Sequence, residues 1–202
     1  KRVNFVDNIF RRQNLLKKLI ILRKYDIIVY VTDGSLFFSP AKKNILVIQS
    51  PVHCPNLTSS GMRFKFKSWQ TVLCYSSFVK KIIDKKLPYP SIVLPPPVDT
   101  ASFPPQEKKN IILSVGRFFP WLHSKKQEVL IRAFKELCQT GLAGWELYLV
   151  GKSEKGAEDY LEKIKKETQG SPIKIITDAS FRELAKIYGQ AKIYWHATGF
   201  GE

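Results

Sequence analysis

The 202-residue chain lacks the features that mark several common protein classes. Its three cysteines and three histidines are far apart in sequence, so neither zinc-ligand spacing nor a disulfide framework is present. No apolar run is long enough to span a bilayer, and no signal-peptide pattern is recognisable. We therefore expect a cytoplasmic protein, in a reducing compartment, without a metal site.

Two motifs are also missing. A Gly-x-Gly-x-x-Gly string after a strand would indicate a dinucleotide-binding dehydrogenase or epimerase, and the sequence contains none. An Asp-x-Asp pair, which could hold a divalent metal, is likewise not found. Any phosphate chemistry would therefore have to use other groups.

Acidic residues are scarce. Lys and Arg number 33 against 17 Asp and Glu, which gives a net charge of +16. Residues 1–107 carry 17 basic and 6 acidic side chains, a balance of +11. Such a field attracts nucleic acid, anionic lipid or phosphorylated substrates. The 44% of hydrophobic residues are enough for a packed core.

Short apolar runs rich in β-branched residues alternate with helical patterns, which is typical of buried parallel strands. This rhythm predicts an α/β fold with two Rossmann-like parallel-sheet domains, both incomplete. The expected strands cover residues 26–31, 45–49, 71–75, 91–94, 110–115, 146–150, 173–176 and 193–196. The expected helices of the second half cover residues 125–139, 157–168 and 181–189, with Ser180 and Glu183 forming a capping box.

A proline-rich stretch from residue 95 to residue 105 is typical of an extended linker. We place the domain boundary there, with domains at 1–103 and 104–202.

Residues 8–24 predict a basic amphipathic helix. It is either a surface helix packed on a sheet or a helix that binds an anionic membrane or a partner. In the second case Arg11, Arg12, Lys17 and Lys18 would contact anionic lipid.

The strongest candidate site follows the strand at residues 110–115. Gly116 allows a tight turn and a close approach to a ligand, and the Arg117 fork can hold phosphate oxygens. Lys125 and Lys126 are predicted to open the next helix, where cations are unfavourable unless an anion is bound. The alternative is that both lysines are merely solvated.

Weaker candidates lie elsewhere. Asp33, Gly34 and Ser35 follow a predicted strand and could face an acceptor, or they form an ordinary turn in which Ser35 caps a helix. His196 ends a predicted strand near the same edge as Gly116, and it is otherwise a plain strand-end histidine. His123 could touch phosphate.

The segment from Ile111 to Phe134 reads IILSVGRFF and then HSKKQEVLIRAF. It closely resembles the start of the donor-binding domain of group 1 (family 4) retaining glycosyltransferases, which have the GT-B fold. Gly116, Arg117 and Lys125 match that pattern, whereas at Lys126 the family more often has Gly. The order and spacing of further segments agree: WELYLVG, ASFRELAKIY and the strand that starts near Ala191, with YSSF and PPVD before them.

The resemblance implies transfer of a sugar from a nucleoside-diphosphate sugar to a glycan or lipid-linked acceptor, with retention of the anomeric configuration. Arg117 and Lys125 would be catalytic, and no cofactor would be needed. Donor contacts would come from Gly116, Arg117, Lys125, Gly151, Ala179 and Phe181.

The sequence also departs from the family. It has neither the N-terminal glycine-rich loop nor the Glu-x7-Glu motif that holds the donor, and Glu202 comes too early to belong to that motif. Two alternatives stay open: a basic nucleic-acid-binding α/β module, and a fragment without activity of its own.

Overall fold

The computed structural model describes residues 14–121 and 124–198 and divides into two compact units, residues 1–97 and 98–202. The division falls within the proline-rich segment, a few residues before the boundary expected after residue 103. A short 3-10 helix, η2 (Thr100–Ser102), lies between the two positions.

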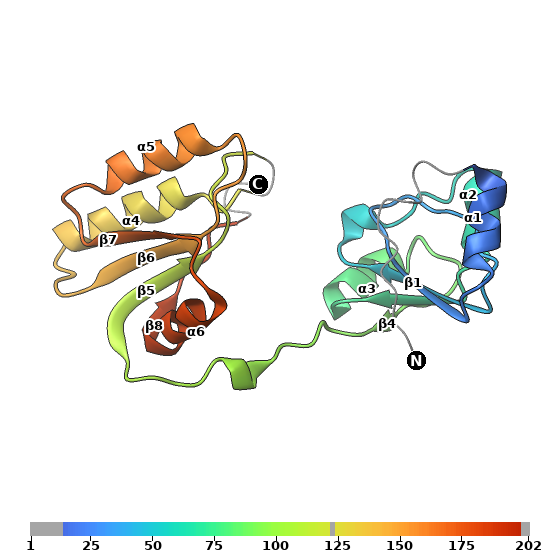
Figure 1. Cartoon of the computed structure of the whole chain (residues 1–202), viewed down its shortest axis with the longest axis horizontal. Coiled ribbons are helices and arrows are strands. Elements are labelled where there is room, and N and C mark those ends of the chain that lie inside the picture. Colours follow the sequence, from blue (N-terminus) through green and yellow to red (C-terminus); the bar gives the residue numbers. More distant parts are fainter. Residues whose placement is uncertain (1–13, 122–123, 199–202) are drawn as a thin grey trace. The chain divides into compact units, whose positions relative to one another are not determined.

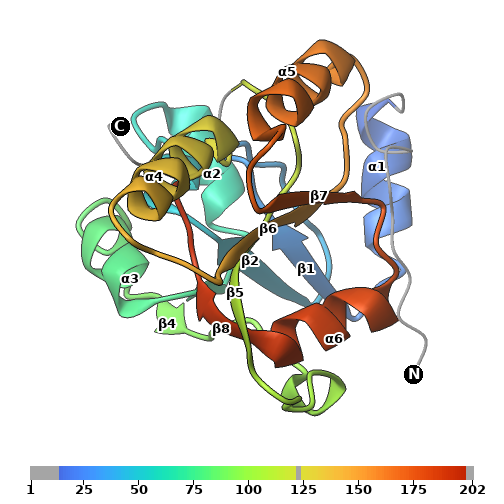
Figure 2. The same ribbon diagram turned by 90° about the vertical axis from the view of Figure 1, so that its left-hand side faces the viewer.

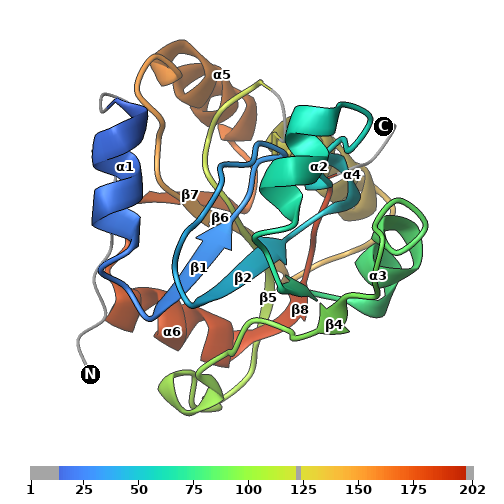
Figure 3. The same ribbon diagram turned by 90° about the vertical axis from the view of Figure 1, so that its right-hand side faces the viewer.

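Unit 1 contains a parallel four-stranded sheet in the order β1-β2-β3-β4 (Figure 3). The strands are β1 (Ile27–Val31), β2 (Lys43–Ile48), β3 (Thr71–Cys74) and β4 (Ile92–Val93). The helices are α1 (Leu15–Leu22), the 3-10 helix η1 (Pro51–His53), α2 (Ser60–Phe66) and α3 (Ser77–Ile83).

The core of unit 1 lies on one face of this sheet. Phe66 of α2 and Ile83 of α3 pack there against Trp69, which is fully buried and donates its indole N–H to the Phe37 carbonyl at 3.0 Å. β1 was predicted to be a buried strand, but its opposite face is exposed. The alternate residues on that face are about half exposed: Ile27, Val29 and Val31.

Helix α1 coincides with only the second half of the helix expected at residues 8–24. Arg11, Arg12 and the other residues before position 14 lie outside the described residues, as do His123 and Glu202.

Unit 2 is built on a second parallel sheet, in the order β7-β6-β5-β8. Helices α4 and α5 cover one face and α6 covers the other (Figures 1 and 2). The strands are β5 (Lys109–Val115), β6 (Glu146–Gly151), β7 (Ile173–Thr177) and β8 (Ala191–Tyr194). The helices are α4 (Gln127–Gln139), α5 (Glu158–Thr168) and α6 (Phe181–Gln190).

Burial on both faces explains the continuous apolar run of β5. Ile112 packs with the α4 and α5 cluster, whereas Ile111 and Leu113 pack with the α6 cluster. The predicted α/β class with parallel sheets is confirmed, and so is the capping box of α6, in which Ser180 and Glu183 bond reciprocally.

Candidate functional site at the carboxyl edge of the second sheet

Two glycines meet where β5 and β6 end. The Gly116 amide donates to the Val150 carbonyl at 2.8 Å. A β-carbon on Gly151 would lie 1.9 Å from the Gly116 carbonyl oxygen, well inside van der Waals contact. Only a glycine at position 151 therefore allows the chain after β5 to take this path.

The following residues anchor the loop and direct Arg117 outward. Phe118 is fully buried, and its amide donates to the Lys152 carbonyl at 2.9 Å. Because Gly116 and Phe118 are both tied to the β6 end, Arg117 between them points away, with its side chain 60% exposed.

The Arg117 guanidinium has two described neighbours. One terminal nitrogen lies 2.8 Å from a Glu154 carboxylate oxygen, and the central carbon lies 4.9 Å from the centre of the Phe119 ring. A guanidinium has five N–H donors, so an ion pair through one nitrogen leaves capacity for an anionic ligand.

Lys125 lies against this loop. A β-carbon on Gly116 would come within 2.4 Å of Lys125 Cγ, so the aliphatic part of the lysine occupies the space above the glycine. The structure thus brings Gly116, Arg117, Lys125 and Gly151 together, although they are distant in sequence.

The expected start of the helix at residue 125 is wrong by two residues. Helix α4 begins at Gln127, and Lys126 precedes it with φ of 49°, in the left-handed region. Lys125 and Lys126 are therefore not in the first helical turn, which instead carries Glu128, as the helix dipole favours. The mismatch of charge is therefore smaller than inferred, because only Lys126, as the N-cap residue, directly adjoins the helix start.

Gln127 is a site residue that the sequence reasoning missed. It is 2% exposed, and its side-chain amide nitrogen lies 3.0 Å from the Arg117 carbonyl and 3.5 Å from the Gly116 carbonyl. A signal was present, because Gln127 shares the buried face of α4 with Leu130, Ile131 and Phe134. A polar residue at a helical spacing from buried apolar residues is predicted to be buried too, and a buried polar side chain needs hydrogen-bond partners.

Ala179 lies close to this edge and Phe181 makes a different contact. The Asp178 amide donates to the Gly151 carbonyl at 3.3 Å, and Ala179 packs with the cluster around Val150. The Phe181 ring is 61% exposed and packs edge-on against Phe103, at 5.4 Å between ring centres.

His196 was expected to end its strand, but β8 ends two residues earlier, at Tyr194. The Tyr194 hydroxyl lies 3.4 Å from the Val115 carbonyl oxygen, and the His196 ring lies over the Tyr194 ring at 6.4 Å. His196 is thus exposed beside the end of β5.

Asp33, Gly34 and Ser35 form a tight turn after β1 in unit 1. The next described element is β2, so Ser35 does not cap a helix. The Asp33 carboxylate accepts from the Ser35 amide at 3.1 Å and from its hydroxyl at 2.6 Å. Gly34 has a φ of 102°, a backbone angle that residues other than glycine rarely adopt. The Thr32 hydroxyl accepts from the Gly34 amide at 2.9 Å and donates to the Ser35 carbonyl at 2.6 Å.

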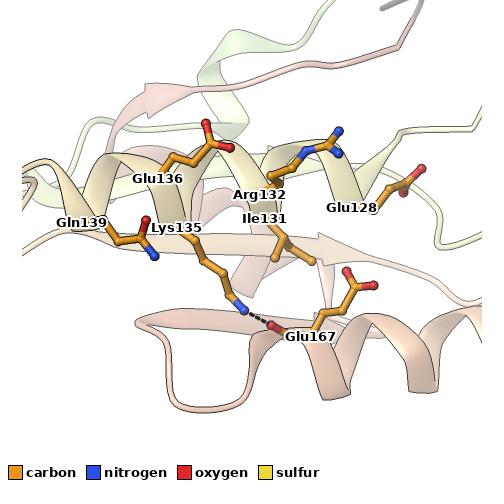
Figure 4. Close-up of a pocket in the computed structure, with 7 residues that line it drawn as sticks. All are labelled: Glu128, Ile131, Arg132, Lys135, Glu136, Gln139 and Glu167. Carbon is orange, nitrogen blue, oxygen red and sulfur yellow. Dashed lines mark hydrogen bonds between the residues drawn. The ribbon is translucent and has the colours of Figure 1, made fainter.

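Open grooves flank α5. One runs between α4 and α5 and is lined mainly by charged groups, with Lys135 donating to the Glu167 carbonyl (Figure 4). The other includes Glu154, the partner of Arg117, together with Lys152, Ser153 and Glu158. Within residues 14–121 and 124–198, no three His, Cys, Asp or Glu side chains cluster as metal ligands.

The doubly wound sheet of unit 2 places these groups where such folds bind ligands, outside the carboxyl ends of the strands. The fold and this edge together define a ligand-binding α/β protein with Rossmann-like domains. The chain belongs to the glycosyl transferases group 1 family, whose model matches residues 98–201. The match begins at the first residue of unit 2.

Two solved structures share the fold of this chain. TarM aligns with a TM-score of 0.60 and 14% identity, over 85% of this chain and 36% of that chain. The Anabaena protein HepE, solved in complex with UDP and glucose, aligns with a TM-score of 0.60 and 14% identity, over 91% of this chain and 55% of that chain. This chain thus spans about a third to a half of these proteins, both of which have the GT-B fold. No curated protein matches it.

Proposed function

We propose that this protein transfers a sugar from a nucleoside-diphosphate sugar to an acceptor. Unit 2 would bind the donor and unit 1 would serve the acceptor. The observation that carries the proposal is the packing of Gly116 against both Gly151 and Lys125, which places Arg117 and Lys125 on the same turn at the strand ends. HepE, which shares the fold, was solved with UDP and glucose, and this supports the choice of donor.

Arg117 and Lys125 would stabilise the negative charge that builds on the departing diphosphate. Arginine matches phosphate geometry with its planar fork, and lysine adds a point charge. Gly116 leaves room for the Lys125 side chain to lie directly against the turn that carries Arg117. We propose that these fixed cations do this work without a metal cofactor, so turnover should persist in excess EDTA.

The test replaces each cation by alanine. Arg117→Ala and Lys125→Ala should each lower turnover by about 100- to 1000-fold, because a preorganised charge-stabilising group is lost. Matched controls are Arg132→Ala, on the exposed side of α4, and Lys163→Ala, on the exposed side of α5. If both site variants retain wild-type turnover, the assignment is wrong.

Binding tests the donor site independently of whether the chain turns over on its own. Isothermal titration of the 202-residue chain with UDP, GDP and ADP should show saturable binding that Arg117→Ala weakens. Retention would appear as an unchanged anomeric configuration in the NMR spectrum of the product, and an inverted product would refute it.

We also propose peripheral contact with an anionic membrane at the cytoplasmic face, where a glycan or lipid-linked acceptor would be reached. Helix α1 exposes Leu16 by 71% and Ile20 by 60%, beside the exposed Lys17. An apolar surface flanked by cations suits the membrane interface. No described helix has the length and apolarity needed to span a bilayer.

Flotation with vesicles tests this contact. The chain should float with phosphatidylglycerol vesicles and not with phosphatidylcholine vesicles, and Lys17→Glu with Leu16→Ser should weaken flotation. Equal flotation with both lipids would exclude an electrostatic contact.

A further inference from the structure

A polar cluster of buried and partly buried side chains lies against the Gly116–Arg117 turn. Its centre is Gln127, the first residue of α4, which is 2% exposed. The cluster continues to Tyr160 of α5, whose hydroxyl lies 3.0 Å from the Gln127 amide oxygen. It connects the loop after β5 with two helices.

The two backbone carbonyls decide how the Gln127 amide is oriented. Its nitrogen faces the carbonyl oxygens of Arg117 at 3.0 Å and Gly116 at 3.5 Å. An amide oxygen in that place would face two other acceptors and be repelled. The nitrogen therefore bonds the turn, and the oxygen is left facing Tyr160.

Tyr160 holds the other end of this amide. Its hydroxyl has one proton, which is shared between a Glu128 carboxylate oxygen and the Gln127 amide oxygen. Burial raises the pKa of the Tyr160 phenol, and the hydrogen bond to Glu128 raises that pKa further. The hydroxyl thus keeps its proton at neutral pH and remains a donor.

This arrangement matters because the backbone amides of Gly116 and Phe118 are tied to the end of β6, whereas Gln127 bonds the carbonyls of Gly116 and Arg117. Glycine has more backbone freedom than other residues, and Gly116 sits directly before the arginine. The Gly116 and Arg117 carbonyls belong to the two peptide units on either side of the Arg117 α-carbon. Fixing both carbonyls therefore fixes the direction in which the Arg117 side chain leaves the backbone.

We propose that Gln127, oriented by Tyr160, is a positioning residue that holds Arg117 for the donor diphosphate. This inference rests on the proposed function. Gln127 does not touch the donor, and it acts through the backbone of the turn. An error of about 1 Å in such a group can cost about 100-fold in rate.

The test is Gln127→Met, which keeps the length and neutrality of the side chain but removes its donors. We expect a 10- to 100-fold lower affinity for UDP or whichever nucleoside diphosphate the wild type binds, about the size expected for the loss of one charge-assisted hydrogen bond. The affinity for the nucleoside without phosphates should stay unchanged. Gln139→Met is the matched control, because Gln139 is an exposed glutamine on the same helix.

A double-mutant cycle separates positioning from general destabilisation. In an Arg117→Ala background, Gln127→Met should have little further effect, since its target is gone. Should Gln127→Met fold poorly, Tyr160→Phe removes a single oxygen and should weaken diphosphate binding about threefold or more. Full additivity in the cycle, or unchanged binding in both variants, would overturn the inference.

The two proposals fail in distinguishable ways. If the wild type binds no nucleoside diphosphate, the proposed function fails. If it binds and Arg117→Ala weakens binding while Gln127→Met and Tyr160→Phe do not, only the positioning role fails.

Discussion

At position 151 the backbone leaves no room for a methyl group. Gly151→Ala would put its β-carbon 1.9 Å from the Gly116 carbonyl oxygen, which is backbone and cannot rotate away. We expect the free energy of unfolding to fall by about 3 kcal/mol or more, as for severe overpacking. Urea denaturation measures this change.

Gly61→Ala is the control for that substitution. Gly61 lies in α2 with no atom within 4 Å of an added β-carbon. Alanine should stabilise there by about 0.5 to 1 kcal/mol, because it reduces the entropy of the unfolded chain. Equal effects of the two substitutions would contradict the steric account.

Glu154 is the second residue-scale test. Its carboxylate pairs with Arg117 at 2.8 Å, and both side chains are more than a third exposed. A bound diphosphate would compete with this carboxylate. Exposed pairs contribute at most about 1 kcal/mol, so Glu154→Gln should tighten diphosphate binding by no more than about fivefold. Weaker binding would mean that Glu154 orients Arg117 instead.

At the scale of elements, Asp84 joins α3 to the start of β4. It accepts from Lys80 at 2.7 Å, and from the amide and hydroxyl of Ser91 at 2.9 and 2.7 Å. Burial alone would raise the pKa of Asp84, but these hydrogen bonds and the Lys80 charge outweigh it and lower the pKa from 3.8 to about 2. The folded state therefore favours the ionised carboxylate.

This shift predicts a pH dependence of stability. A carboxylate whose pKa is lowered on folding stabilises the folded state, and this contribution is fully present above the pKa of the unfolded chain. The contribution is lost as pH falls from about 4 to about 2. Asp84→Asn should cost about 2 kcal/mol at pH 7, the scale of a hydrogen bond to a charged group. The difference from wild type should shrink in that acidic window, as followed by urea denaturation. Asp159→Asn, on the exposed side of α5, is the control.

Element boundaries show where local patterns stop being informative. The strand and helix periods fix most of the elements, because both faces of β5 and the buried stripes of α4 and α6 must be apolar. The exact start of α4 depends on the left-handed backbone at Lys126, which no local propensity of lysine predicts. The contacts of the preceding loop decide it.

At the scale of the molecule, the net charge of +16 leads to a salt-dependence test of the rival function, nucleic-acid binding. A polyanion that contacts many lysines releases many counterions, so its affinity should fall about 1000-fold or more between 50 and 200 mM salt. Binding of a nucleoside diphosphate should depend much less on salt, because a small ligand has no condensed counterion layer to release and is only screened. Filter binding with duplex DNA and titration with UDP compare the two. Tight DNA binding at 150 mM salt would favour a nucleic-acid-binding module.

The sequence alone determined the α/β class, the succession of strands and helices, and the candidate pair Arg117 and Lys125, because periodicity and turn chemistry are local. Tertiary structure decided what surrounds that pair. Gly151 touches Gly116, Glu154 meets Arg117, and Gln127 reaches back to the turn from a helix that the sequence alone started too early. These contacts join residues up to 37 positions apart. They exist only because parallel strands bring their carboxyl ends to one edge.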